Sequence, residues 1–77
     1  MLATDYFLND VLIKRPYIRE EWITLALQKP YRQEIQLDDG RIRHWVWIAD
    51  LGRYLRVVTL EDGQTVHNAF PDRRFKP

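Results

Sequence analysis

The sequence predicts an α+β fold in which two short N-terminal helices precede a four-stranded antiparallel β-meander. From Gln33 onward, stretches of alternating side chains rich in branched and aromatic residues are separated by segments that each end in glycine, the residue that accepts positive φ without strain. Before Gln33, apolar residues recur at helical spacing instead. The three gaps between strands are Asp38-Asp39-Gly40, Asp50-Leu51-Gly52 and Glu61-Asp62-Gly63.

Length and composition limit the class of protein. The 77 residues are expected to form a single domain over residues 1–77. The chain has no cysteine, which excludes a disulfide framework and a thiolate metal site. No apolar run approaches the roughly 20 residues that span a bilayer. We therefore expect a cytoplasmic protein with no cofactor, no metal and no membrane contact.

Charge is distributed unevenly along the chain. Residues 1–40 hold five Lys or Arg against seven Asp or Glu, whereas residues 41–77 hold seven against four. Six of the seven cations in the second half are arginine, whose guanidinium binds phosphate or carboxylate through two parallel hydrogen bonds. The strand half is therefore the half suited to a polyanion, although a pI near 8.1 is low for a dedicated nucleic-acid binder.

Two helices are expected, at about residues 4–15 and 19–28. Thr4 can cap the first turn, and Pro16 ends this helix because a proline disfavours helical geometry in the residue before it. Pro30 stops the second helix in the same way. The apolar positions with helical spacing are Tyr6, Phe7, Val11 and Leu12 in the first segment and Trp22, Ile23, Ala26 and Leu27 in the second.

Four strands are expected at about residues 33–37, 41–49, 53–60 and 64–70, followed by a short tail, 71–77. Treating the last gap as a two-residue turn and the other two as three-residue loops fixes a register, and opposed residues then share a face. The predicted core face holds Ile35, Leu37, Trp45, Trp47, Leu55, Val57, Val66 and Phe70. The predicted second face holds Glu34, Gln36, His44, Val46, Ile48, Tyr54, Arg56, Val58, His67 and Ala69. We expect the second helix to lie across the Trp45/Trp47 face.

The second face carries the residues with catalytic potential. In this register His44 and His67 flank Val58, Arg56 lies diagonal to both, and Glu34 lies beside His44. A histidine next to a carboxylate and an arginine that holds a phosphate are the groups needed for attack of a ribose 2′-hydroxyl on its own phosphodiester. The catalytic candidates are therefore His44, Arg56 and His67, and the substrate-binding candidates are Glu34, Tyr54, Arg73 and Arg74.

A purely structural interpretation stays open beside the catalytic one. The second face is as apolar as it is polar, so the first helix or a partner protein is able to cover it. His44 and His67 would then be ordinary hydrogen-bonded residues. No pair of residues has the spacing of a zinc site, and the chain lacks both serine and cysteine, which excludes those two nucleophiles.

The order of elements resembles small bacterial proteins of the BrnT and RelE/ParE toxin superfamily. The likeness rests on the helical segment Ile18–Leu27, on the meander from Gln33 to Phe70, and on the closing Phe70-Pro71-Asp72-Arg73-Arg74. The segment Arg53–Phe70 is similar to a group of short cyanobacterial-type proteins at the edge of that superfamily. The chain departs from the pattern in being less basic, in lacking a Lys-rich helix, and in carrying Phe75 where members have a tyrosine.

This resemblance implies a RelE-like fold, a metal-independent endoribonuclease activity and a cognate antitoxin protein. The leading expectation is therefore a toxin-like protein of a toxin-antitoxin system that acts on RNA, with Arg56 and Arg73 on phosphate and His44 or His67 moving protons. The alternative is a non-catalytic protein-protein interaction module, homodimeric through its second face or an edge strand.

Overall fold

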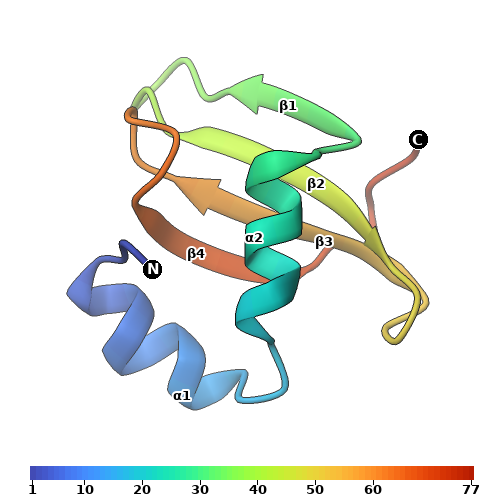
Figure 1. The fold of residues 1–77 in the computed structure, drawn as a ribbon. Helices are drawn as coiled ribbons and strands as arrows, with labels where there is room; N and C mark the ends of the chain where they lie inside the picture. The colour runs from blue at the N-terminus through green and yellow to red at the C-terminus, as the bar shows by residue number, and fades with distance from the viewer.

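The computed structural model describes all 77 residues and has the predicted α+β architecture, with two helical segments followed by a four-stranded antiparallel sheet. Figure 1 shows both helical segments on the same side of the sheet. The strands follow one another across the sheet in the order β1-β2-β3-β4. The elements are η1 (Phe7–Val11), α1 (Leu12–Lys14), α2 (Glu20–Gln28), β1 (Arg32–Ile35), β2 (Ile42–Ile48), β3 (Arg53–Thr59) and β4 (Val66–Pro71).

The first helical segment is π-helical in its middle and α-helical at its end. The Leu12 N–H donates to the Phe7 carbonyl, five residues earlier, and this wider turn brings Phe7 and Val11 to the same buried side. Thr4 caps the segment, since its Oγ1 accepts a hydrogen bond of 3.1 Å from the Phe7 N–H. Helical geometry stops at Arg15, directly before Pro16.

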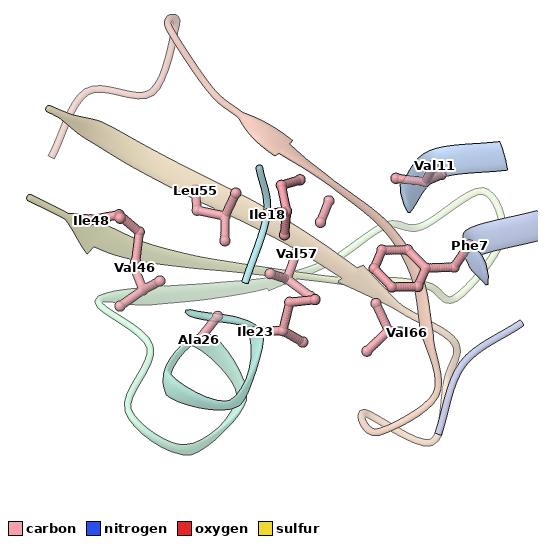
Figure 2. Close-up of a cluster of buried hydrophobic side chains, with 11 residues drawn as sticks. Phe7, Val11, Ile18, Ile23, Ala26, Val46, Ile48, Leu55, Val57 and Val66 are labelled. Atoms are coloured by element: carbon pink, nitrogen blue, oxygen red, sulfur yellow. The ribbon is translucent and has the colours of Figure 1, made fainter. Parts of the chain in front are cut away.

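Helix α2 covers the sheet with one apolar stripe. Ile23 and Ala26 are buried, and they pack with Val57 and other apolar residues of β2 and β3 in a single core cluster. Figure 2 shows this cluster between the helices and one face of the sheet, with Phe7 and Val11 of the first helical segment toward one end. The cluster consists of Phe7, Val11, Ile18, Ile23, Ala26, Val46, Ile48, Leu55, Val57, Val66 and Ala69.

The strand register differs by one residue from the register that the sequence predicts, because the first two loops are one residue longer and β4 contains an additional residue at His67. Ile48 pairs with Arg53, so residues 49–52 form a four-residue loop closed by Gly52 at φ +62°. The Gln36 N–H donates to the Arg41 carbonyl at 2.7 Å, and the Leu60 N–H donates to the Thr65 carbonyl at 2.9 Å. The first of these contacts encloses four residues where three are expected, whereas the second agrees with the predicted register next to the last turn.

This shift reverses the predicted faces of β2. His44, Val46 and Ile48 face the helices, whereas Trp45 and Trp47 lie on the opposite face, so the prediction that α2 covers Trp45 and Trp47 is wrong. Ile35 and Leu37, also predicted to be core, are 65% and 97% exposed. Leu55, Val57 and Val66 are buried as expected.

The N-terminal residues lie beside the last strand. Ala3 forms a parallel bridge with Val66, and the Thr4 N–H donates to the Val66 carbonyl at 2.9 Å. This contact closes the helical layer against β4. None of the helices has the length and apolar character required to cross a bilayer.

Candidate functional site

The sheet face turned away from the helices, called the open face below, presents one row of side chains that crosses all four strands. Arg32 pairs with Trp45, Trp45 with Arg56, and Arg56 with Phe70. The Arg56 guanidinium lies 5.4 Å from the centroid of the Trp45 ring and 4.9 Å from that of Phe70. Alternating cationic and aromatic side chains in contact of this kind stabilise one another through cation–π attraction.

Asp72 fixes this row from the segment that follows β4. Its Oδ2 accepts hydrogen bonds from Trp45 Nε1 at 2.9 Å and from Arg56 Nε and Nη2 at 3.1 and 2.9 Å. Its backbone N–H donates to the Tyr54 carbonyl at 2.8 Å. The side chain is only 6% exposed, so the chain is pinned to the open face at this residue.

The ionisation of Asp72 follows from these partners. Burial by itself raises the pKa of a carboxyl group, because the charged form loses hydration. The donors from Trp45 and Arg56, with the Arg74 N–H and the Arg56 charge, outweigh burial and hold the pKa of Asp72 below its ordinary value. Asp72 is therefore a carboxylate at neutral pH and neutralises much of the Arg56 charge.

A continuous row of aromatic rings extends from this anchor. Phe75 stacks on Trp45 with ring centroids 4.8 Å apart and planes 21° from parallel. Phe75 also lies 4.8 Å from Tyr54, and Tyr54 lies 5.3 Å from Trp47. Tyr31 joins the row 5.3 Å from Tyr54. The exposed half of Trp47 ends the row in solvent.

Two open hollows that both have Phe75 in their lining, of about 240 and about 470 Å³, concentrate positive charge on this face. Six of the twelve Lys and Arg residues of the chain line them, against two carboxylates, Glu34 and Asp72. The hollows therefore carry a net positive charge although the whole chain has a net charge of only +1. The six cations are Arg32, Arg53, Arg56, Arg73, Arg74 and Lys76.

The open face brings together five of the seven residues predicted to form a site. Glu34, Arg56 and Arg74 line the first hollow. Tyr54 and Arg73 line the second. The two histidines lie elsewhere, so the predicted constellation of His44, Arg56 and His67 is not assembled. The cause is the one-residue shift of register, which moves His44 to the opposite face from Arg56.

His44 is a core residue. It is 1% exposed, its Nδ1 lies 3.2 Å from Gln33 Nε2, and its Nε2 lies 2.8 Å from Thr59 Oγ1. The Gln33 amide nitrogen is a donor, so Nδ1 accepts and the ring is neutral with its proton on Nε2. Burial lowers the pKa of His44, because the imidazolium is poorly hydrated there. Glu34, expected beside His44, pairs with Arg43 instead.

His67 occupies an irregularity in β4. Val58 pairs with Asn68 and Thr59 with Val66, so His67 is the additional residue of a β-bulge. Its Nδ1 lies 3.1 Å from Thr4 Oγ1, and its ring lies 5.0 Å from that of Tyr6. Burial, with a smaller contribution from the Arg41 charge, lowers the pKa of His67. His67 therefore joins the helical segment to the sheet.

Several residues of the open face were not predicted as site residues. The sequence pattern assigns Trp45 to the core, gives Phe75 only as a departure from a tyrosine, and gives Asp72 only as part of the closing motif. A sequence signal existed for Asp72, since an acid between Pro71 and two arginines has cationic partners within reach. No sequence signal places Phe75 on Trp45, because that contact depends on the path of the chain after β4.

Comparison of the chain with models of protein families, with curated proteins and with solved structures gives no significant match. The resemblance to the BrnT and RelE/ParE superfamily accordingly stays a prediction. The side chains of the open face are the functional evidence that the molecule offers.

Proposed function

We propose that the open face binds single-stranded RNA by stacking bases on its aromatic row and by contacting phosphates through its arginines. The observation that carries the proposal is the row Trp47, Tyr54, Phe75 and Trp45, with neighbouring rings no more than 5.3 Å apart, whose rings line two hollows together with cations. Proteins that hold single strands combine these two features, because every base has a flat face and every linkage has a negative charge.

The accessible rings supply the stacking surface. Trp47 is 50% exposed, and Tyr31 is also exposed beside Tyr54. Trp47 and Tyr31 both contact Tyr54. A folded domain gains little stability from such exposed rings, whereas stacking of a base on one of them contributes about 1–3 kcal/mol. RNA is proposed ahead of DNA because the toxin-like sequence pattern implies an RNA target.

Phosphate contacts are assigned to the exposed arginines and not to Arg56. Two nitrogens of Arg56 already bind Asp72, so its charge is compensated. Arg73 and Arg74 are exposed and have no carboxylate partner within ion-pair distance. The same is true of Arg32 and Lys76. Binding through these side chains releases counterions from the nucleic acid and therefore weakens as salt rises.

The arrangement supports binding better than cleavage. General base catalysis needs a side chain within hydrogen-bond reach of the 2′-hydroxyl. His44 is buried under the helices and His67 is bonded to Thr4, so neither faces a strand held on the open face. In a toxin-like system this protein would sequester RNA on the open face, and an antitoxin partner would compete for that face.

Fluorescence anisotropy with a short fluorescein-labelled single-stranded RNA tests the proposal. The wild type should bind, with affinity falling steeply between low and moderate salt. Trp47→Ala and the double variant Arg73→Ala/Arg74→Ala should each weaken binding, the second with a smaller salt slope. Lys14→Ala is the matched control, because Lys14 is an exposed cation on the helical side of the molecule. Equal affinity of all four proteins, or no binding, would contradict the proposal.

The same samples test for cleavage and for the choice of nucleic acid. The RNA should remain intact after incubation with the wild type. Cleavage that disappears in His67→Ala would instead support the endoribonuclease interpretation. A single-stranded DNA of the same sequence should bind more weakly if the 2′-hydroxyl is read, and equally if only stacking and charge contribute.

A second candidate function is self-association through β1. Every residue of this edge strand is exposed, and Ile35 together with the nearby Leu37 presents apolar surface to solvent. Unprotected edges of this kind pair with other strands. Sedimentation analysis tests it: a dimer that Ile35→Lys converts to a monomer supports pairing through β1, and a monomeric wild type excludes it.

A further inference from the structure

We propose that the Phe75 ring occupies a nucleobase subsite, and that a base enters this subsite by displacing the segment that carries Phe75. The segment Asp72–Pro77 is called the strap below. The inference rests on the proposed RNA-binding function and adds to it the position of one base and an internal competitor for that position.

The surroundings of Phe75 are those that a base requires. Trp45 stacks on one ring face at 4.8 Å, Tyr54 lies at 4.8 Å with a tilt of 56°, and Tyr31 meets the ring edge-on at 6.1 Å. The Arg32 guanidinium lies 4.8 Å from the ring centroid. Three aromatic rings and one guanidinium therefore enclose a single flat group. A nucleobase in the same place would stack on Trp45 and contact Arg32 as the phenyl ring does.

Hydrogen bonds fix the strap at Asp72 and Arg74. Asp72 is held by its side-chain and backbone hydrogen bonds, and the Arg74 N–H donates to Asp72 Oδ1 at 3.1 Å. Beyond Arg74, residues 75–77 make no hydrogen bond and no ion pair. The aromatic and cation–π contacts of the Phe75 ring hold that part of the chain on the open face. Its release therefore breaks aromatic contacts and leaves the Asp72 anchor intact.

Release of Phe75 exposes the face of the Trp45 ring in a preorganised orientation. Trp45 is only 3% exposed in the presence of the strap. Its indole N–H remains bonded to Asp72 Oδ2, and the Arg56 side chain remains over the ring, so its orientation is fixed before any base arrives. Arg74 and Lys76, which flank Phe75 in the strap, line the hollow beside the subsite.

The direction in which Phe75→Ala changes the affinity for RNA shows whether Phe75 competes with a base or stacks on it. If Phe75 competes with the base, Phe75→Ala strengthens binding, because a larger share of molecules has an open subsite. If Phe75 is itself a stacking partner, the same change weakens binding. The probe is a fluorescein-labelled oligoadenylate, and the expected gain in affinity for Phe75→Ala is about two- to tenfold, the range that one aromatic pair contributes. Ile13→Ala, an exposed apolar truncation on the first helical segment, is the matched control.

A second measurement keeps the test valid if Phe75→Ala unfolds. In the wild type, nuclear Overhauser contacts between the Phe75 and Trp45 rings should be present without ligand and lost on adding oligoadenylate. If the wild type binds and Phe75→Ala binds equally well or more weakly, the subsite is overturned and the proposed function stands. The same holds if the wild type binds and the ring contacts are retained. Absence of binding by both proteins overturns the subsite and the proposed function together.

Discussion

The guanidinium of Arg56 and the carboxylate of Asp72 form the most buried ion pair of the protein, with Nη2 and Oδ2 2.9 Å apart and side chains 23% and 6% exposed. Trp45 donates to the same oxygen. One carboxylate thereby fixes a strand cation, a strand aromatic ring and the start of the strap. The pair determines the shape of the open face, while the exposed arginines around it remain available to a ligand.

Removal of the Asp72 charge should destabilise the fold. Asp72→Asn leaves Arg56 partly buried without its counter-ion, and we expect the free energy of unfolding to fall by about 1–3 kcal/mol. Chemical denaturation at neutral pH measures the loss. Glu21→Gln is the matched control, because the Arg19–Glu21 pair is exposed and 3.5 Å long. That change should cost about 0–1 kcal/mol.

Acid should remove the difference between wild type and Asp72→Asn. The folded pKa of Asp72 lies below its ordinary value of 3.8, so the carboxylate contributes its full stabilisation above pH 3.8 and loses it as pH falls through the folded pKa. The two proteins should therefore converge in stability below that range. A difference that stays constant into strong acid would show that Asp72 acts through its shape alone.

The fold should also lose stability in mild acid because of its histidines. The pKa of His44 is lowered by burial from its ordinary value of 6.5, so on acidification the unfolded chain binds a proton before the folded chain does. Stability should therefore decrease as pH falls below about 6.5. Urea denaturation of His44→Gln across this range should give a flatter pH dependence than the wild type.

His67→Gln provides the comparison for that experiment. The pKa of His67 is lowered in the same direction, but its side chain is only partly buried, whereas His44 is 1% exposed. The larger share of the pH dependence should therefore disappear with His44. An unchanged slope in His44→Gln would mean that the folded state accepts a proton at His44 as readily as the unfolded state.

The loop between β2 and β3 offers a test of backbone strain without a steric contribution. Gly52 has φ +62°, and an added Cβ at this position would meet no atom within 4 Å. Gly52→Ala should therefore cost only the conformational penalty of about 1–2 kcal/mol, and Gly52→Asn should cost less, because asparagine tolerates the left-handed region. Thermal unfolding of the two variants measures both. Equal losses would argue against strain as the cause.

The sequence is sufficient to predict the helices-then-sheet order, because glycine-terminated gaps and helical spacing are local signals. The register is not local in this sense. In Trp45-Val46-Trp47-Ile48 both alternating positions are apolar, so hydrophobicity does not distinguish the core face of β2. The lengths of the first two loops decide the register of β2, since each encloses four residues where three are predicted.

The candidate site changed with the register. Tyr54 and Arg56 were placed on one face correctly relative to each other, since they belong to the same strand at alternate positions. His44 was placed beside them through a cross-strand pairing that is wrong by one residue. The contact between Phe75 and Trp45 was beyond prediction, because it joins an irregular segment to a residue that the pattern assigned to the core.

Nuclear magnetic resonance titration of the wild type with short single-stranded RNA locates the binding surface residue by residue. We expect chemical shifts to change at Trp47, Tyr54, Arg53 and Arg73, and at the Trp45 indole N–H, while resonances of α2 and of the first helical segment stay in place. Changes confined to the helical side or to β1, or no changes at RNA concentrations that saturate known single-strand binders, would contradict the assignment of the open face as the RNA-binding surface.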